Sequence, residues 1–251
     1  MALERGLAVI ALTDHDTMAG VAEAQEAADG TGLEVIPGVE INSEIDHGDL
    51  HILGYYVAPE HLPLQEKLTA LRNGRLTRAR EMVARLSGMG MALAWEDVQA
   101  LAGGESIGRP HIARALCENG YVETIQEAFD RFLSRGGAAY VPRLRLAPHE
   151  TIAAIAAAGG VPVLAHPAHS GPHVLAHIPE FVAYGLRGLE VYYPHHTPGE
   201  VEQLLALCQT HDLLATGGSD FHRPAHTEGA SLGSVHVPMS CVERLREAAG
   251  R

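Results

Sequence analysis

The sequence contains little cysteine and few aromatic residues, and it has no long apolar run. Its three cysteines are far apart and form no CxxC pair, which argues against a disulfide framework and favours a reducing cytoplasm. No run reaches the roughly 20 apolar residues that a membrane span needs, and no signal-peptide pattern opens the chain. Aromatic residues make up only 5% of the chain, so binding of single strands by base stacking is not expected.

Positive charge is also scarce. Eighteen Lys and Arg residues stand against 31 Asp and Glu residues, which gives a formal net charge of -13. Because the chain has no overall basic field, double-stranded nucleic acid is not an expected partner, and any phosphate must be bound locally or through cations. The sequence also contains no P-loop, no GxSxG motif and no Cys/His pair, so it lacks these common patterns of phosphate binding and covalent catalysis.

Histidine, by contrast, is abundant, with 16 residues in the chain. Neutral imidazole is the commonest metal ligand in proteins, and carboxylates complement it for hard or borderline cations. Surface drift is the alternative explanation of the abundance, so the positions of the histidines decide between the two. The length of 251 residues and the hydrophobic share of 46% suit one barrel-sized domain with an insertion.

Strand and helix patterns alternate at both ends of the chain, which predicts an α/β architecture with a parallel sheet. Apolar runs predict strands at residues 7–12, 33–36, 51–57, 162–165, 188–192 and 213–216. Helical repeats cover residues 16–28, 149–158, 174–184 and 198–211. In the middle of the chain the alternation stops, and helical patterns cover 64–86, 95–102, 111–119 and 124–134. We therefore expect a barrel from residues 1–62 and 146–251, with a helical insertion at 63–145.

Histidines and acidic residues gather just after the predicted strands. The residues in this position are His15, Glu40, His166, His195, His196, Asp220 and His222. In parallel α/β folds, functional side chains collect at the carboxyl ends of the strands, and a random scatter of histidines would not follow this pattern. His51 lies inside an apolar strand, where a lone histidine is more often a hydrogen-bonded core residue. The pattern as a whole predicts a multinuclear metal site.

Six short motifs carry these residues along the chain: TDHDT at 13–17, GVEIN at 38–42, HILGY at 51–55, LAHP at 164–167, LEVYY at 189–193 and GSDFH at 218–222. In these motifs and their order the chain resembles the PHP family (polymerase and histidinol phosphatase domain), metal-dependent phosphoesterases on a distorted seven-stranded α/β barrel. The insertion, with GRPH at 108–111 and GGAAYVP at 136–142, is similar to one branch of that family. That branch contains nucleoside 3′,5′-bisphosphate phosphatases and the 5′→3′ exoribonuclease ribonuclease AM.

The resemblance implies a site for up to three divalent cations. Glu40 would bridge two metals, and His51 and His166 would complete the second of them. Asp220 would bind the first metal, while His15 and His222 would bind the third. Mn²⁺ is the expected metal, with Fe²⁺ or Zn²⁺ as alternatives. A hydroxide shared by the bridged metals would attack phosphorus while the cations neutralise the phosphoryl oxygens.

The resemblance is incomplete at the front of the chain. The family opens with a strand that carries a His-x-His pair and an Asp, and no such pattern precedes Leu7. Residues 1–6 resemble instead the last turn of the helix after this strand, with Gly6 as its C-cap. We therefore expect a barrel that lacks its first strand and binds fewer metals. Two interpretations explain the missing strand. Either the start of the protein is assigned to an internal methionine, or the protein is a degenerate member of the family that has lost this strand.

Arginines of the insertion are candidates for binding a substrate phosphate that is not cleaved. Arg109 in the GRPH turn is the first candidate, followed by Arg75 and Arg78 with His111, because Arg suits bidentate phosphate recognition. The alternative for the arginines of the long helix is that they form only a row of charges on a solvent-exposed face, with no role in binding. Arg143 is a further candidate at the end of the insertion.

His196 is predicted to act as a general acid or to contact the substrate phosphate, in preference to its neighbour His195. Other histidines receive no functional role. His169, His173 and His177 are expected to face solvent, and His47 is expected to lie in a hairpin.

The expected function is hydrolysis of a phosphate ester in nucleoside 3′,5′-bisphosphates or at the 5′ end of short RNA. Histidinol phosphate is the alternative substrate, although the arginines of the insertion argue against it. A catalytically inactive binding or regulatory module is the alternative of another class, because three of the family's metal ligands are missing. The sequence does not fix the oligomeric state.

Overall fold

The computed structural model describes residues 1–45, 48–103, 107–142, 145–222 and 230–251. The chain divides into two compact units, one of Met1–Leu68 with Arg145–Arg251 and the other of Thr69–Leu144. His47, expected in a hairpin, and Arg143, a candidate phosphate-binding residue, lie outside the described residues. Within the described ranges, no helix is both long and apolar enough to cross a membrane.

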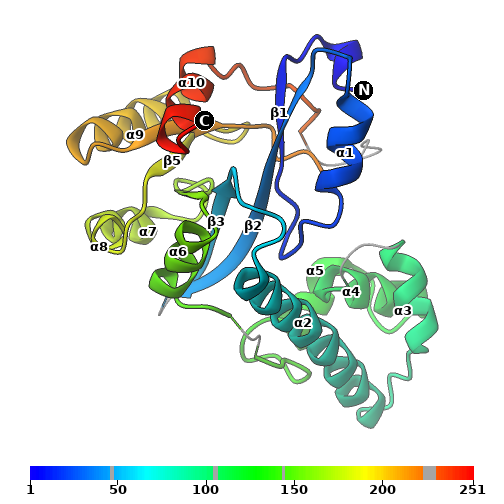
Figure 1. Cartoon of the computed structure of the whole chain (residues 1–251). Helices are drawn as coiled ribbons and strands as arrows, with labels where there is room; N and C mark the ends of the chain where they lie inside the picture. Colours follow the sequence, from blue (N-terminus) through cyan, green and yellow to red (C-terminus); the bar gives the residue numbers. More distant parts are fainter. Residues whose placement is uncertain (46–47, 104–106, 143–144, 223–229) are drawn as a thin grey trace. The chain divides into compact units, whose positions relative to one another are not determined.

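The larger unit is built on a curled six-stranded sheet that forms part of a barrel (Figure 1). Its strands follow one another in space in chain order: β1 (Val9–Leu12), β2 (Glu34–Ile45), β3 (Gly48–Tyr55), β4 (Val161–Leu164), β5 (Gly188–Tyr192) and β6 (Leu214–Gly217). β1 pairs with β2 in parallel, and β4, β5 and β6 are also parallel neighbours. β3 is antiparallel to both β2 and β4, so the expectation of a wholly parallel sheet was wrong.

β2 differs most from the prediction, which ended this strand at Ile36. Pro37 and Gly38 do not end it, because Pro37 pairs with Leu12 of β1 and Gly38 begins the antiparallel pairing with β3. Gly38 also allows the close approach of the chain here. A Cβ at this position would lie 2.7 Å from Thr13 Cγ2 and 2.8 Å from the Gly54 carbonyl oxygen. Glu40 therefore lies inside a long strand rather than after a short one.

Helices cover the sheet from several sides. α1 (Val21–Ala28) packs against β2, α6 (Pro148–Ala157) packs against β2, β3 and β4, and α9 (Pro198–Thr210) packs against β5 and β6. α10 (Met239–Ala248) contacts β6, and the short helices α7 (Pro172–Ala176) and α8 (Ile178–Ala183) follow β4. Tyr55, Val163 and Leu245 are among the buried residues of the core of this unit.

Two of the predicted helices of this unit differ from the observed ones. The helix predicted from residue 16 begins only at Val21, because Asp16 adopts a left-handed φ of 55°. The helix predicted over 174–184 is divided into α7 and α8 at His177. At the front of the chain, the turn η1 (Leu3–Arg5) ends at Gly6, which has a φ of 69° and donates its backbone N–H to the Leu3 carbonyl. The predicted C-cap is thereby confirmed.

Helices are the only regular secondary structure among the described residues of the smaller unit. It contains most of α2 (Leu62–Gly88), followed by α3 (Trp95–Ala102), α4 (Arg109–Glu118), α5 (Ile125–Ala128) and the π-helical turn η2 (Phe129–Leu133). Fully buried side chains such as Met82, Ile112 and Leu133 form a core of its own. The helix predicted over 124–134 is thus an α-helical turn that continues as a π-helical one.

Candidate metal centre

Glu40 lies at the centre of the predicted ligand cluster, and backbone pairing places His15 beside it. The Glu40 N–H donates to the Asp14 carbonyl at 3.1 Å, and the Asp16 N–H donates to the Glu40 carbonyl at 2.8 Å. The segment after β1 therefore continues alongside β2 for one more residue pair, His15 with Glu40. His51 comes from the neighbouring strand β3, where it pairs with Asn42.

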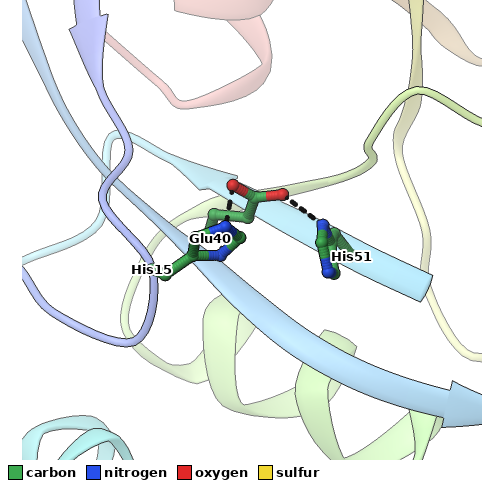
Figure 2. Close-up of side chains that lie close together, drawn as sticks. All are labelled: His15, Glu40 and His51. Atoms are coloured by element: carbon green, nitrogen blue, oxygen red, sulfur yellow. Dashed lines mark ion pairs between the residues drawn. The ribbon is translucent and has the colours of Figure 1, made fainter. Parts of the chain in front are cut away.

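The Glu40 carboxylate lies between two imidazole rings, with one oxygen directed at each (Figure 2). Oε1 is 2.7 Å from His51 Nδ1, and Oε2 is 3.3 Å from His15 Nδ1. His166 Nε2 lies 3.5 Å from Oε1 and 3.2 Å from His51 Nδ1. One ligand atom from each of Glu40, His15 and His51 lies within 4.8 Å of the others, so these atoms can share a cation.

Glu40 is 4% exposed, and its surroundings keep it ionised. Burial alone would raise the pKa of this carboxyl, but hydrogen bonds from His166 and His51 and the charge of nearby imidazoles outweigh burial and lower the pKa well below its ordinary value. A carboxylate that stays charged while buried is suited to contact cations.

His166 follows β4 and reaches the cluster with a strained backbone. Its φ is 29°, a left-handed value that costs a non-glycine residue roughly 1–3 kcal/mol. Its backbone N–H donates to Glu190 Oε2 at 2.8 Å, which holds the strained turn. Glu190 lies on β5 and is 5% exposed, and burial raises its pKa to about 8. This residue was not a candidate in the sequence, although it lies in the motif LEVYY.

Asp220 and His222 complete the cluster on the side of β6. Asp220 also has a left-handed φ, of 49°, and its Oδ2 accepts a hydrogen bond from the Tyr193 hydroxyl at 3.2 Å. The His222 ring centroid is 5.9 Å from that of His15. His222 is exposed, and its Nδ1 donates to the Asp220 carbonyl at 2.9 Å.

A buried polar pair supports His15 from behind. Asp16 is fully buried, and its carboxylate accepts hydrogen bonds from the Asn42 backbone N–H at 3.3 Å and side-chain amide at 3.4 Å. The same amide nitrogen lies 3.3 Å from His15 Nδ1. Sequence reasoning missed both residues. The spacing of Asn42 two residues after Glu40, on the same face of a strand, was the available signal.

These residues fit a group of divalent cations. Imidazole nitrogens and carboxylate oxygens are the ligands that Zn²⁺, Mn²⁺ and Fe²⁺ accept. His51 Nδ1, His166 Nε2 and Glu40 Oε1 all lie within 3.5 Å of one another. All six predicted ligands lie in the larger unit.

The predicted phosphate-binding arginines lie in the smaller unit. Arg78 is 8% exposed, its Nε donates to the Val141 carbonyl at 2.6 Å, and its guanidinium lies 5.5 Å from the Tyr140 ring centroid. The fold of this unit therefore already uses part of the hydrogen-bonding capacity of Arg78. Arg75 is partly buried on the same helix.

Arg109 is the first residue of α4, and its guanidinium lies 5.6 Å from the ring centroid of Phe129. His111 Nδ1 accepts the backbone N–H of Gly108 at 3.1 Å, so this imidazole caps the start of the same helix. Both residues are partly exposed, and both lie in the first turn of α4.

His196, the predicted general acid or phosphate contact, forms a local hydrogen bond to the backbone. Its Nδ1 donates to the Val191 carbonyl at 2.9 Å, which leaves Nε2 as the unprotonated nitrogen of a neutral ring. Nε2 is buried and has no hydrogen-bond partner among the described residues, and burial lowers the pKa of the ring. The proposed role of His196 therefore stays a prediction. His195, the alternative, is exposed.

The chain matches the PHP domain over residues 1–135, which is more than half of its length. The chain belongs to the PHP family. It is 33% identical over 255 aligned residues to a 3′,5′-nucleoside bisphosphate phosphatase of Chromobacterium violaceum, an alignment that covers 100% of this chain and 89% of the relative. It is 35% identical over 228 residues to the 5′-3′ exoribonuclease Rnm of Escherichia coli, with 89% of this chain and 78% of the relative covered.

A solved structure supports the same assignment. A metal-dependent phosphoesterase of Bifidobacterium adolescentis superimposes with a TM-score of 0.82 at 36% identity, and the match covers 100% of this chain and 90% of that one. The curled sheet is thus the distorted barrel of the PHP fold. The protein is a metal-dependent phosphoesterase of this family, and the predicted resemblance is confirmed.

Proposed function

We propose that this PHP-family protein hydrolyses a phosphate ester of nucleoside 3′,5′-bisphosphates or of the 5′ end of short RNA. The observation that carries the proposal is the buried, ionised Glu40 between imidazoles from three different parts of the chain. The relatives from Chromobacterium violaceum and Escherichia coli, a bisphosphate phosphatase and an exoribonuclease, support this choice of substrate.

The proposed cofactors are divalent cations, with Mn²⁺ as the first candidate and Fe²⁺ or Zn²⁺ as alternatives. Glu40 would bridge two of them, with His51 and His166 on one, Asp220 on the other, and His15 and His222 on a third. When bound, such cations neutralise phosphoryl oxygens and make a water molecule more acidic. In the hydrolysis, the water oxygen bonds to phosphorus and the water gives up one proton, while the ester P–O bond breaks and the leaving oxygen takes up one proton.

Other residues of the chain keep the proposed metal ligands in place. Glu190 fixes the turn of His166 through its backbone N–H, and the Tyr193 hydroxyl fixes one oxygen of Asp220. Hydrogen bonds of this kind orient ligands and are expected to affect activity nearly as much as the ligands do. Asp16 orients His15 in a similar way, because it accepts a hydrogen bond from the Asn42 amide that contacts the His15 ring.

Arginines of the smaller unit would select substrates that carry a second phosphate. Arg109 is the first candidate for binding this second phosphate. Arg75, Arg78 and His111 are the further candidates. A guanidinium presents parallel N–H donors that match two phosphate oxygens at once. Histidinol phosphate has a single phosphate, so the proposal predicts a preference against it.

A substrate panel tests the proposal. The purified chain, loaded with Mn²⁺, Fe²⁺ or Zn²⁺ in turn, is assayed for hydrolysis of four substrates. Phosphate release is measured for adenosine 3′,5′-bisphosphate, adenosine 5′-monophosphate and histidinol phosphate, and nucleotide or phosphate release is measured for a 5′-phosphorylated tetranucleotide RNA. We expect kcat/KM to be at least about tenfold higher for the bisphosphate or the RNA than for the two monoesters. Equal or higher values for histidinol phosphate would contradict the proposal, and so would the absence of any metal-dependent turnover.

A further inference from the structure

The histidines of the larger unit form a longer row than the predicted ligands account for. Six imidazole rings follow one another with successive centroid distances of 5.9, 5.0, 5.1, 6.0 and 5.9 Å, in the order His222, His15, His51, His166, His169 and His195. The first four are the predicted metal ligands. The last two, His169 and His195, are not among the predicted metal ligands.

The chemical character of the row changes after His166. The first four rings each lie within ion-pair distance of Glu40 or Asp220. His169 and His195 are exposed, and within the described part of the chain neither forms an ion pair with a carboxylate. A pair of imidazoles without a carboxylate lacks the oxygen ligands that a hard cation such as Mn²⁺ prefers, whereas its N–H groups can bind an anion. Each ring can donate a hydrogen bond from an N–H group. Hydrogen bonds from N–H groups to anions are shorter and stronger than hydrogen bonds between neutral groups.

Tyr193 fixes the position of this pair relative to the metal ligands. Its ring centroid lies 5.4 Å from that of His166, 5.9 Å from that of His169 and 5.6 Å from that of His195. The ring is 9% exposed, and its hydroxyl donates to Asp220. A buried, hydrogen-bonded ring is a rigid support, and the two exposed imidazoles lie against the same ring as the predicted ligand His166.

The two histidines also occupy the functional edge of the sheet. His169 follows β4 and His195 follows β5, and these two strands are parallel neighbours. Loops after neighbouring parallel strands meet at the same edge, where α/β proteins place their ligand contacts. Both residues belong to the larger unit, so the pair is complete without any residue of the smaller unit.

We propose that His169 and His195 bind the scissile phosphate, through oxygen atoms on the side that faces away from the metal ligands. This inference rests on the proposed function, because it assumes a phosphate beside Glu40, His51 and His166. It assigns to these histidines a contact that every phosphate ester makes, with or without a second phosphate. The assignment differs from that of Arg109, which concerns only substrates with two phosphates.

Inorganic phosphate is the probe that tests this subsite without turnover. Calorimetric titration of phosphate into the metal-loaded full chain is compared among the parent, His169→Ala, His195→Ala and the double variant. His173→Ala, which removes an exposed imidazole on α7 outside the row, is the matched control. We expect phosphate to bind about tenfold more weakly to each single variant, as for the loss of one hydrogen bond to a charged group, and with parent affinity to the control. Metal content should equal that of the parent in every variant.

Activity on two substrates separates this inference from the proposed function. For the single variants, kcat/KM should fall by similar factors for adenosine 5′-monophosphate and adenosine 3′,5′-bisphosphate. Unchanged phosphate affinity in the double variant would overturn the subsite and leave the proposed function standing. Loss of bound metal from the variants would also overturn it, because the histidines would then be ligands. If the parent binds phosphate but hydrolyses neither ester, a loss of affinity in the variants still supports the subsite while the proposed function fails.

Discussion

Glu190 shows how much a single buried carboxyl contributes to the geometry of the cluster. It accepts the backbone N–H of His166, whose left-handed conformation needs such support, and it has almost no exposure to solvent. Burial raises its pKa to about 8, so in the metal-free protein the carboxyl is mostly protonated at neutral pH. The protonated group still has a carbonyl oxygen that can accept the N–H of His166.

The raised pKa of Glu190 predicts a pH dependence of stability. Between pH 4.5 and 8 the folded protein keeps a proton that the unfolded chain loses, so the free energy of unfolding falls as the pH rises. Glu190→Gln removes this contribution and keeps a hydrogen-bond acceptor. In urea unfolding with chelator present, we expect the parent to lose on the order of 3 kcal/mol more than the variant between pH 5 and pH 8.

Glu23→Gln, which removes the same charge at an exposed position on α1, is the control for the Glu190 variant. Its unfolding free energy should follow that of the parent across the pH range. Equal losses for the parent and Glu190→Gln would contradict the assigned pKa.

Arg109 provides a test of substrate selection at the same scale. Arg109→Ala should raise KM for adenosine 3′,5′-bisphosphate about tenfold, because a charged hydrogen-bond pair with the second phosphate is lost. KM for adenosine 5′-monophosphate should change by less than about twofold, since this substrate has no second phosphate. Steady-state kinetics on both substrates measures the two values.

Arg80→Ala is the matched control for Arg109→Ala. Arg80 belongs to the same unit, and its guanidinium lies 5.0 Å from the Trp95 ring centroid, so it too stacks on an aromatic ring. It should leave both KM values near those of the parent. Equal effects of Arg109→Ala on the two substrates would remove the proposed role of this arginine.

At the scale of elements, the pairing of β2 with both β1 and β3 determines where Glu40 lies. This arrangement depends on the missing side chain of Gly38, which leaves room for Thr13 and for the Gly54 carbonyl. Any larger residue must displace backbone or a β-branched side chain, and neither moves easily in a packed sheet.

Gly38→Ala should therefore destabilise the protein by roughly 1–3 kcal/mol and reduce bound metal, because Glu40 is only two residues away. Gly199→Ala is the control, since a Cβ on this residue of α9 meets no atom within 4 Å. Ala in a helix should leave stability equal or raise it by up to about 1 kcal/mol. Chemical unfolding and metal analysis check both variants, and unchanged stability of Gly38→Ala would contradict the role of this close approach.

The sequence predicted well those features that follow from local chemistry. Motifs with paired histidines and acids, such as TDHDT and GSDFH, predicted the residues that the structure brings together, and apolar runs predicted all six strands. The reversal of direction at β3 was not predicted, because Pro37 and Gly38 are usual strand-ending residues and here continue the strand. Only the pairing with β1 and β3 explains their place, and pairing is not a property of one segment.

The histidines illustrate the same limit at close range. His169 was expected to face solvent, and it is exposed, yet its ring also lies beside His166 and Tyr193. His196 was preferred over His195, but its Nδ1 bonds to the carbonyl of Val191 and its Nε2 is enclosed. Neighbouring residues after a strand point to different sides, and sequence alone does not say which side faces the site.

At the scale of the whole molecule, an acidic protein acts on an acidic substrate. The formal net charge of -13 opposes the approach of a phosphate ester, so the attraction must come from bound cations and from local groups of imidazoles and arginines. The ionised Glu40 in the interior is consistent with this arrangement, because a buried carboxylate is favoured where a cation can lie beside it. We therefore expect activity to depend on metal bound at Glu40.

Metal analysis of the parent and of Glu40→Gln, combined with phosphate release from adenosine 3′,5′-bisphosphate, tests this claim most directly. The variant keeps the size of the side chain and removes its charge. We predict that the parent retains Mn²⁺ after desalting and releases phosphate, and that the variant loses bound metal and at least about 100-fold in kcat, as expected when a ligand of the reacting cations is removed. A Glu40→Gln variant with parent metal content and parent activity would contradict the account.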